Sequence, residues 1–188
     1  MTPDFQALLQ TLSVPAPTAS QLRRFVGREA LASRTPPDYL YTTGYAYRLN
    51  TAGTRALYGS EDATTAGAEW ERQAARVPNV LTQVLYFIEV RLPVLDLEQA
   101  SNLTALQLAP ADLSAPWAFV SVPTKLQLLG EAVARQQRFG AVRFPSDAAC
   151  SRGFAGFNIV AFPSAITEPM SVVIRDDTGA EIQRWPAP

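Results

Sequence analysis

Hydrophobic residues recur every three or four positions in three parts of the chain, which is the spacing of an amphipathic helix. Residues 4–12 show this spacing first, behind Asp4, a residue type that caps helix N-termini. The spacing continues over residues 20–34, which end before the pair Pro36-Pro37, and it returns over residues 124–137. We therefore predict a helix in each of these segments.

A fourth helix is predicted from the signal at its N-terminus. Ser60 is followed by Glu61 and Asp62, and acidic side chains in a first helical turn interact favourably with the helix dipole. Pro78 lies downstream and cannot continue a helix. The helix should therefore run from residue 60 to about residue 76.

Short runs of β-branched, aromatic and aliphatic residues, bounded by Pro, Gly, Asn or Asp, predict β-strands. The predicted strands are residues 38–50, 54–58, 80–97 with a break at Pro93, 141–144, 157–162, 171–174 and 182–185. Residues 103–117 are predicted to form a loop with short helical turns. Helices come first, strands and helices mix in the middle, and strands come last. This order indicates an α+β fold with a mostly antiparallel or split sheet.

The composition fits a single globular domain. The chain has 188 residues, of which 47% are hydrophobic and 18% are charged, and its formal net charge is −1. A chain with this net charge lacks the excess of basic residues that nucleic-acid binding requires, so we expect no direct nucleic-acid binding. The most apolar run, residues 84–90, is far shorter than the roughly 20 residues of a membrane span. The first residues lack the features of a signal peptide, and we expect a cytoplasmic protein.

The chain contains no histidine, which excludes several kinds of catalytic site. Nucleophile–histidine systems and zinc sites with imidazole ligands cannot form without it. The single cysteine, Cys150, cannot form an internal disulfide, and we predict a small, half-buried thiol. Asp176 and Asp177 lie side by side, and we predict a solvated turn there, not a catalytic pair. We expect no bound metal.

Several short motifs follow one another along the chain. They are Tyr47-Arg48-Leu49-Asn50 with Gly53, Ala56-Leu57-Tyr58, Glu69, Val94-Leu95-Asp96-Leu97, Asp112-Leu113 with Pro116-Trp117, Phe139-Gly140-Ala141-Val142-Arg143-Phe144-Pro145-Ser146, and Phe157-Asn158-Ile159-Val160. In this order and spacing, over roughly residues 40–176, the chain resembles the RES-domain family, which is named for its Arg, Glu and Ser. The resemblance places the family's polar site at Arg48, Tyr58, Glu69 and Ser146.

The resemblance implies a fold similar to that of ADP-ribosyltransferases, with a split, mostly antiparallel β core and flanking helices. It also implies a bacterial toxin that cleaves NAD, with phosphate or water as the acceptor. A helix-turn-helix antitoxin, whose C-terminal part covers the active site, would be its partner. Residues 38–188 would then form the RES-like domain. Residues 1–37 would be an N-terminal helical extension that holds the antitoxin or a second copy of the chain in a homodimer.

The resemblance also implies a role for each site residue. Glu69 would hold the nicotinamide ribose hydroxyls and stabilise positive charge as the glycosidic bond breaks. Because nicotinamide leaves from a cationic state, no strong general acid is needed, which suits a chain without histidine. Arg48 would clamp the pyrophosphate or an incoming phosphate. Tyr58 would stack on nicotinamide, and Ser146 would donate a hydrogen bond to the carboxamide or to a phosphate.

Two departures from the family pattern leave alternatives open. Leu49 stands where Trp or Phe usually follows the site arginine, and Asp147 stands where an arginine is usual shortly after the Pro-Ser pair. An ADP-ribosyltransferase that acts on a protein is one alternative, and a binding domain without turnover is another. Ser164, after Pro163, is a rival for the site serine. Trp117 and Trp185 would line a partner surface or belong to the core.

Overall fold

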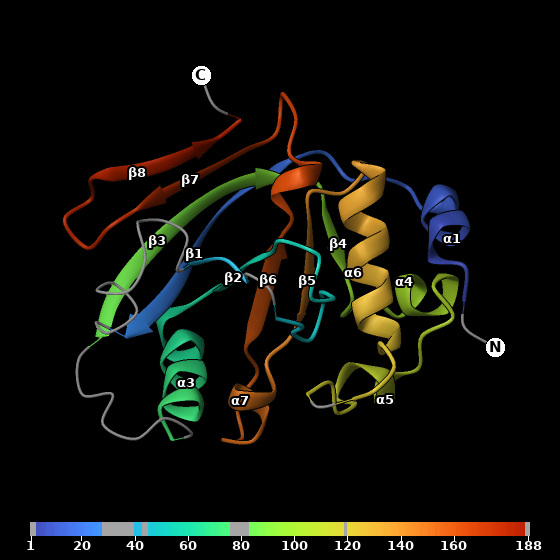
Figure 1. The fold of residues 1–188 in the computed structure, drawn as a ribbon, viewed down its shortest axis with the longest axis horizontal. Coiled ribbons are helices and arrows are strands. Elements are labelled where there is room, and N and C mark those ends of the chain that lie inside the picture. Colours follow the sequence, from blue (N-terminus) through green and yellow to red (C-terminus); the bar gives the residue numbers. More distant parts are fainter. Residues whose placement is uncertain (1–2, 28–39, 43–44, 76–82, 119, 187–188) are drawn as a thin grey trace.

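The computed structural model describes residues 3–27, 40–42, 45–75, 83–118 and 120–186, and the fold is built on an eight-stranded sheet. The strand order is β4-β5-β6-β2-β1-β3-β7-β8, and neighbouring strands are antiparallel except β4 and β5. The strands are β1 Thr18–Gly27, β2 Leu57–Ser60, β3 Gln83–Leu92, β4 Val94–Asp96, β5 Ala141–Pro145, β6 Phe157–Ala161, β7 Ser171–Arg175 and β8 Glu181–Trp185. The helices are α1 Phe5–Thr11, α3 Ala63–Ala74, α4 Ala100–Ala105, α5 Pro110–Leu113, α6 Lys125–Gln136, α7 Asp147–Cys150 and the 3-10 turn η2 Pro163–Ala165. The predicted α+β class with a mostly antiparallel sheet is confirmed (Figure 1).

The sheet divides between β1 and β2. Strand β1 pairs with β3 along its whole length, but it pairs with β2 at one position, where Arg23 lies opposite Ser60. Gly59 permits this crossing, because a Cβ atom at residue 59 would lie 2.8 Å from the Cβ of Leu22. The sheet therefore consists of two halves, β4-β5-β6-β2 and β1-β3-β7-β8, which meet at this crossing (Figure 1).

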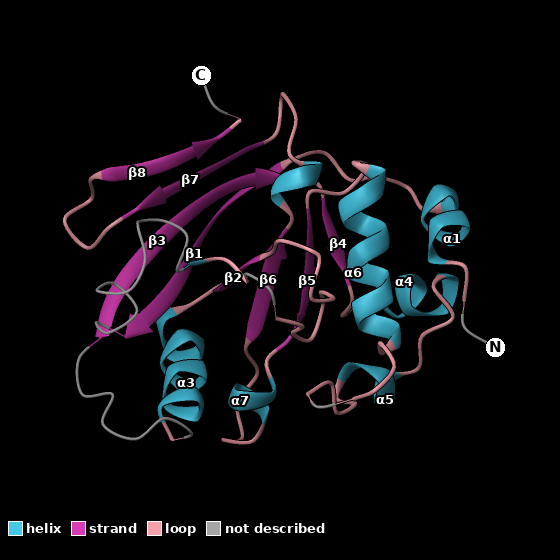
Figure 2. Cartoon of the chain, in the orientation of Figure 1, coloured by secondary structure: helices cyan, strands magenta, loops and turns pink. Residues whose placement is uncertain are grey.

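Two hydrophobic cores pack against the sheet. The first core packs α1, α4 and α6 against β5 and β6, and it includes Phe5, Leu129 and Val160. The second core lies on β1, β3 and β7 around Leu22 and Ile174, and it continues over β2, β5 and β6. Figure 2 shows α1, α4, α5 and α6 beside the first half, whereas α3 and α7 lie together near the ends of β2 and β6. Strands β5 and β6 thus contribute to both cores, because successive residues of a strand point to opposite faces of the sheet.

Most of the predicted elements after residue 60 are confirmed. The predicted helix at residues 124–137 is α6, which begins with a capping box between Thr124 and Gln127. The break at Pro93 separates β3 from β4, and the four predicted late strands are β5, β6, β7 and β8. Residues 103–117 contain the end of α4 and the single turn of α5. Helix α3 begins at Ala63 because Asp62, not Ser60, is its N-cap.

The predicted helix over residues 20–34 is wrong where the structure describes it, because residues 18–27 form strand β1. Leu22 and Val26 are both buried, and residues four positions apart share one face of a strand as well as one face of a helix. The spacing therefore fitted both structures, and pairing with β3 along ten register positions favours the strand. Residues 28–34 lie outside the described residues.

Three other predictions concern the first 60 residues. The predicted strand at residues 38–50 is wrong for its described part, which contains only isolated bridges such as Tyr41 to Leu57, while residues 38–39 and 43–44 lie outside the described residues. The strand predicted at residues 54–58 is β2, shifted to Leu57–Ser60. The extension predicted for residues 1–37 is helical only in α1 among its described residues, and its separation from residues 38–188 stays a prediction.

Three smaller features complete the fold. Cys150 is exposed, so the predicted half-buried thiol is wrong: the cysteine ends the short helix α7 on the surface. Asp176 forms the predicted turn, since its Oδ1 accepts hydrogen bonds from the backbone nitrogens of Thr178 and Ala180. In the described part of the chain, no helix is both long and apolar enough to cross a membrane.

Candidate functional site

A cavity of about 320 Å³ lies where the two halves of the sheet meet. Its walls come from β1, β2, β6, α3 and the segment around residues 47–48. The cavity is lined by four arginines, two carboxylates and a group of aromatic rings. They are Arg23, Arg24, Arg48, Arg72, Glu69, Asp147, Phe25, Tyr47, Tyr58, Trp70, Trp117 and Phe144. Although the whole chain has a net charge of −1, these ionised side chains leave the cavity with two positive charges more than negative ones.

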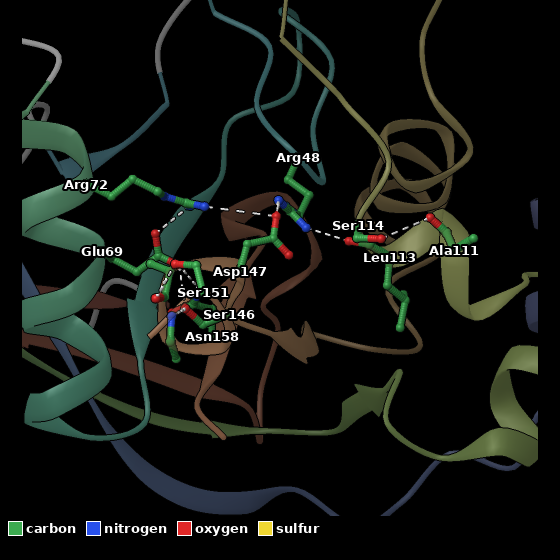
Figure 3. Close-up of polar contacts among 12 residues, drawn as sticks. Arg48, Glu69, Arg72, Ala111, Leu113, Ser114, Ser146, Asp147, Ser151 and Asn158 are labelled. Atoms are coloured by element: carbon green, nitrogen blue, oxygen red, sulfur yellow. Dashed lines mark hydrogen bonds and ion pairs between the residues drawn. The ribbon is translucent and has the colours of Figure 1, made fainter. Parts of the chain in front are cut away.

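Glu69 is held at the cavity wall by three donors. Its Oε1 accepts hydrogen bonds from the hydroxyl of Ser146 and from Nδ2 of Asn158, each at 2.7 Å. Its Oε2 accepts from Nη2 of Arg72 at 2.6 Å, one helical turn along α3. Figure 3 shows these donors converging on the carboxylate. Both oxygens of the side chain thus accept hydrogen bonds, and these bonds fix its orientation at the cavity wall.

Ser146 and Asn158 are themselves fixed by their surroundings. Ser146 is 1% exposed, and its hydroxyl oxygen accepts a hydrogen bond from the backbone nitrogen of Ala149 at 3.1 Å, as the N-cap of α7. The side-chain oxygen of Asn158 accepts from the hydroxyl of Ser60 on the neighbouring strand β2 at 2.7 Å. The donors of Glu69 therefore come from rigid elements, which preorganises the carboxylate.

Helix α3 is placed against this group by a close contact. A Cβ atom at Gly156 would lie 2.3 Å from Oγ1 of Thr65, so only glycine allows α3 to approach the segment that leads into β6. Asp62 caps the helix by accepting from the backbone nitrogen of Thr65 at 2.8 Å. Glu69 lies about one helical turn after Thr65. Its side chain points toward Asn158. Asp62 thus determines where α3 begins, and Gly156 allows α3, which carries Glu69, to pack closely against the segment before β6.

Arg48 lies on the opposite wall and is 7% exposed. Its guanidinium donates to the backbone carbonyl of Leu113 and forms an ion pair with Oδ2 of Asp147 (Figure 3). Burial lowers the pKa of Arg48, and the nearby guanidinium of Arg72 lowers it further. A buried cation of this kind requires an anion beside it, because an unpaired buried charge is costly.

Helix α6 positions the segment that carries Arg48. A Cβ atom at Gly130 would lie 1.7 Å from the carbonyl oxygen of Leu49, so the helix backbone packs directly on the residue that follows Arg48. Nε2 of Gln127 donates to the carbonyl of Tyr47 at 2.8 Å. Leu49 is fully buried, and this position, where the resembled family usually has an aromatic residue, belongs here to the contact with α6.

Tyr58 contributes its ring to the cavity and its hydroxyl to the surrounding structure. The hydroxyl donates to Oδ1 of Asn50 at 3.0 Å and accepts from the backbone nitrogen of Leu49 at 3.0 Å. Burial raises the pKa of Tyr58, so the phenol stays neutral. Its ring lies 6.0 Å from that of Tyr47, which stacks on Trp117 with a centroid separation of 5.6 Å. The aromatic side chains form a continuous wall suited to a planar ligand.

Arg24 is a cavity residue that sequence reasoning missed. Its Nη1 donates to the carbonyl of Tyr58 at 3.0 Å, and burial lowers its pKa. Its Nε is buried and has no hydrogen-bond partner among the described residues. A buried donor without a partner is costly in a folded protein, and it remains available to a ligand oxygen.

The structure brings all four predicted site residues to one place. Arg48, Tyr58 and Glu69 line the cavity, and Ser146 contacts Glu69 from behind it. The rival Ser164 lies elsewhere, with its hydroxyl on the carbonyl of Ala134 in α6. Trp117 lies in the cavity wall, whereas Trp185 packs edge-on against Tyr41 at 5.2 Å.

Sequence reasoning also missed Arg72, Asn158 as a donor, and Asp147 as a partner of Arg48. A usable signal existed for Arg72, because it lies three residues after Glu69 on a predicted helix, where ion pairs form. Asn158 belongs to one of the motifs that carry the family resemblance, but nothing in the local sequence indicated that it reaches Glu69, which lies 89 residues away. Among the described residues, no group of three or more His, Cys, Asp or Glu side chains could hold a metal ion.

Comparison with known proteins identifies the family of the chain. A search of curated proteins found no match. The model of the RES domain, in contrast, matches residues 21–186, which include most of β1 and every side chain of the cavity described above. This match covers nearly the whole chain, and the chain therefore belongs to the RES domain family.

Proposed function

We propose that this protein cleaves the bond between nicotinamide and ribose in NAD, and that it acts as the toxin of a toxin–antitoxin pair. The observation that carries the proposal is the carboxylate of Glu69, held by Ser146, Asn158 and Arg72 at the wall of an arginine-rich cavity. Membership of the RES domain family supports a reaction on NAD. A helix-turn-helix antitoxin remains the proposed partner.

The charge of the cavity suits a dinucleotide. NAD carries two negative charges on its pyrophosphate, and the described side chains of the cavity have an excess of two positive charges. Arg48 and Arg24 offer planar groups of donors, which bind phosphate oxygens in pairs. The wall formed by Tyr58, Tyr47 and Trp117 would accept the nicotinamide ring or the adenine by stacking.

Glu69 would stabilise the transition state of bond cleavage. As the bond breaks, its electron pair leaves with nicotinamide and positive charge develops on the ribose carbon. A preorganised carboxylate interacts more strongly with this developing charge than with the neutral sugar, and such interactions lower the barrier. Ser146 and Asn158 would act as positioning residues, because their donors are directed at Glu69.

Phosphate or water would complete the reaction by attacking the ribose carbon. With phosphate, an oxygen of the dianion forms the new bond, and the products are nicotinamide and ADP-ribose 1″-phosphate. With water, one proton goes to solvent and ADP-ribose is formed. Arg48 and Arg72 are the residues that would attract an incoming phosphate, since both guanidinium groups face the same part of the cavity (Figure 3).

The test compares Glu69→Gln with Glu71→Gln in an assay of nicotinamide release from NAD. Glu71 lies on the same helix, and its exposed side chain pairs with Arg152, so its variant makes the same change of charge outside the cavity. We expect turnover to fall by about 100-fold or more in Glu69→Gln and to stay at the wild-type level in Glu71→Gln. Equal turnover in both variants would overturn the assignment of Glu69. No nicotinamide release by the wild-type protein would favour a protein-directed transferase or a binding domain.

A further inference from the structure

Asp147 lies between two arginines of the cavity. Its Oδ2 forms an ion pair with Nη2 of Arg48 and lies 3.9 Å from Nη1 of Arg72. Figure 3 shows the carboxylate between the two guanidinium groups. A phosphate oxygen of a ligand would form the same charge-assisted contacts with the two guanidinium groups. In the free protein, a side chain of the protein makes these contacts.

The two carboxylates of the cavity are held very differently. Glu69 accepts from three side chains, two of which are buried. Among the described residues, the only side chains that pair with the carboxylate of Asp147 are the two arginines. The side chain of Asp147 is 32% exposed, whereas that of Arg48 is 9% exposed. Asp147 can therefore turn into solvent when another anion takes its place beside Arg48, whereas Arg48 cannot leave the protein interior.

The position of Asp147 in the chain allows this movement. It is the first residue of α7, a helix of four residues whose backbone is held in place by the buried Ala148 and Ala149. The N-cap of that helix is Ser146, which bonds Glu69 and stays in place when the neighbouring side chain rotates. Exchange of the anion beside Arg48 thus requires one side-chain rotation and no change of fold.

We propose that Asp147 is an internal competitor for the anion site, which pairs with Arg48 in the free protein and is displaced by the pyrophosphate of the bound substrate. This inference rests on the proposed function, and it identifies Asp147 as the group that controls access of the substrate's pyrophosphate to Arg48. When a site is available only in a fraction of the molecules, the apparent dissociation constant rises by the inverse of that fraction. Asp147 therefore weakens the binding of any pyrophosphate ligand and sets the substrate concentration at which the site fills.

The experiment measures the dissociation constant of inorganic pyrophosphate by isothermal titration calorimetry for the wild type, Asp147→Asn and Asp147→Ala. Asp96→Asn is the matched control, because Asp96 pairs with Arg143 at 3.1 Å outside the cavity and its loss changes the net charge equally. We expect pyrophosphate to bind about tenfold more tightly to both Asp147 variants than to the wild type or to the control. Thermal unfolding of each variant, with and without pyrophosphate, shows that the proteins are folded.

Unchanged or weaker binding in the folded Asp147 variants would overturn the proposal, since Asp147 would then only orient Arg48. Absence of pyrophosphate binding in all four proteins would overturn it as well. Cleavage of NAD is measured on the same samples. Tighter pyrophosphate binding without NAD cleavage would support the competitor and contradict the proposed function, whereas NAD cleavage without tighter binding would contradict the competitor alone.

Discussion

Gly130→Ala tests whether helix α6 positions the arginine of the site. The added Cβ would lie 1.7 Å from the carbonyl oxygen of Leu49 and 3.1 Å from the ring of Phe162. Because Cβ atoms essentially never approach other atoms within 3.0 Å, the helix and the segment with Arg48 must move apart by about 1.3 Å. Such overpacking typically costs about 1–3 kcal/mol of the free energy of unfolding.

The same displacement should impair turnover. A displacement of about 1 Å in a catalytic group can lower the rate by about 100-fold, because the reacting geometry is lost. We therefore expect kcat/KM for NAD to fall by about two orders of magnitude in Gly130→Ala. The measurements are nicotinamide release at several NAD concentrations and unfolding in urea followed by tryptophan fluorescence.

Gly67→Ala is the control for this substitution. Gly67 lies within helix α3, and a Cβ atom there meets no atom within 4 Å. Alanine is favoured over glycine inside a helix by about 1 kcal/mol, so this variant should be as stable as the wild type or more so, with unchanged turnover. If Gly130→Ala also retained wild-type stability and turnover, the contact between α6 and Leu49 would not position Arg48.

Two further predictions concern Ser146 and Tyr58. Ser146→Ala removes the N-cap of α7 and a donor to Glu69, so the free energy of unfolding should fall by about 1–3 kcal/mol and NAD turnover should fall with it; a variant as stable and active as the wild type would refute this role. Burial raises the pKa of Tyr58 above its ordinary value of about 10, so above that pH the phenol ionises in the unfolded chain before it does in the folded protein. The stability advantage of the wild type over Tyr58→Phe should therefore shrink by up to about 1.4 kcal/mol per pH unit above pH 10 in urea unfolding, and a constant difference would contradict it.

The sequence predicted the second half of the fold better than the first. Strands β5 to β8 are bounded by proline, glycine or aspartate, and helix α6 has both an apolar face and a capping box, so local signals agree there. In β1 the local signal was ambiguous, because Leu22 and Val26 share a face in a helix and in a strand. Long-range pairing with β3 decides between the two structures, and a local pattern carries no information about that pairing.

In the candidate site, too, some residues were predicted from the sequence and others were not. Arg48, Tyr58, Glu69 and Ser146 were found through the family resemblance. Arg24 was missed because its segment was interpreted as a helix, so that no reason existed to place it beside Tyr58. Asp147 was identified as a departure from the family pattern, but its ion pair with Arg48 spans 99 positions in sequence and is visible only in the structure.

The most direct test of the central claim is the fate of NAD incubated with the wild-type protein, with and without inorganic phosphate. Chromatography of the products should show one nicotinamide for each NAD consumed, together with ADP-ribose 1″-phosphate when phosphate is the acceptor or ADP-ribose when water is. Recovery of intact NAD under both conditions, from protein shown to be folded, would contradict the claim that this cavity cleaves the nicotinamide–ribose bond.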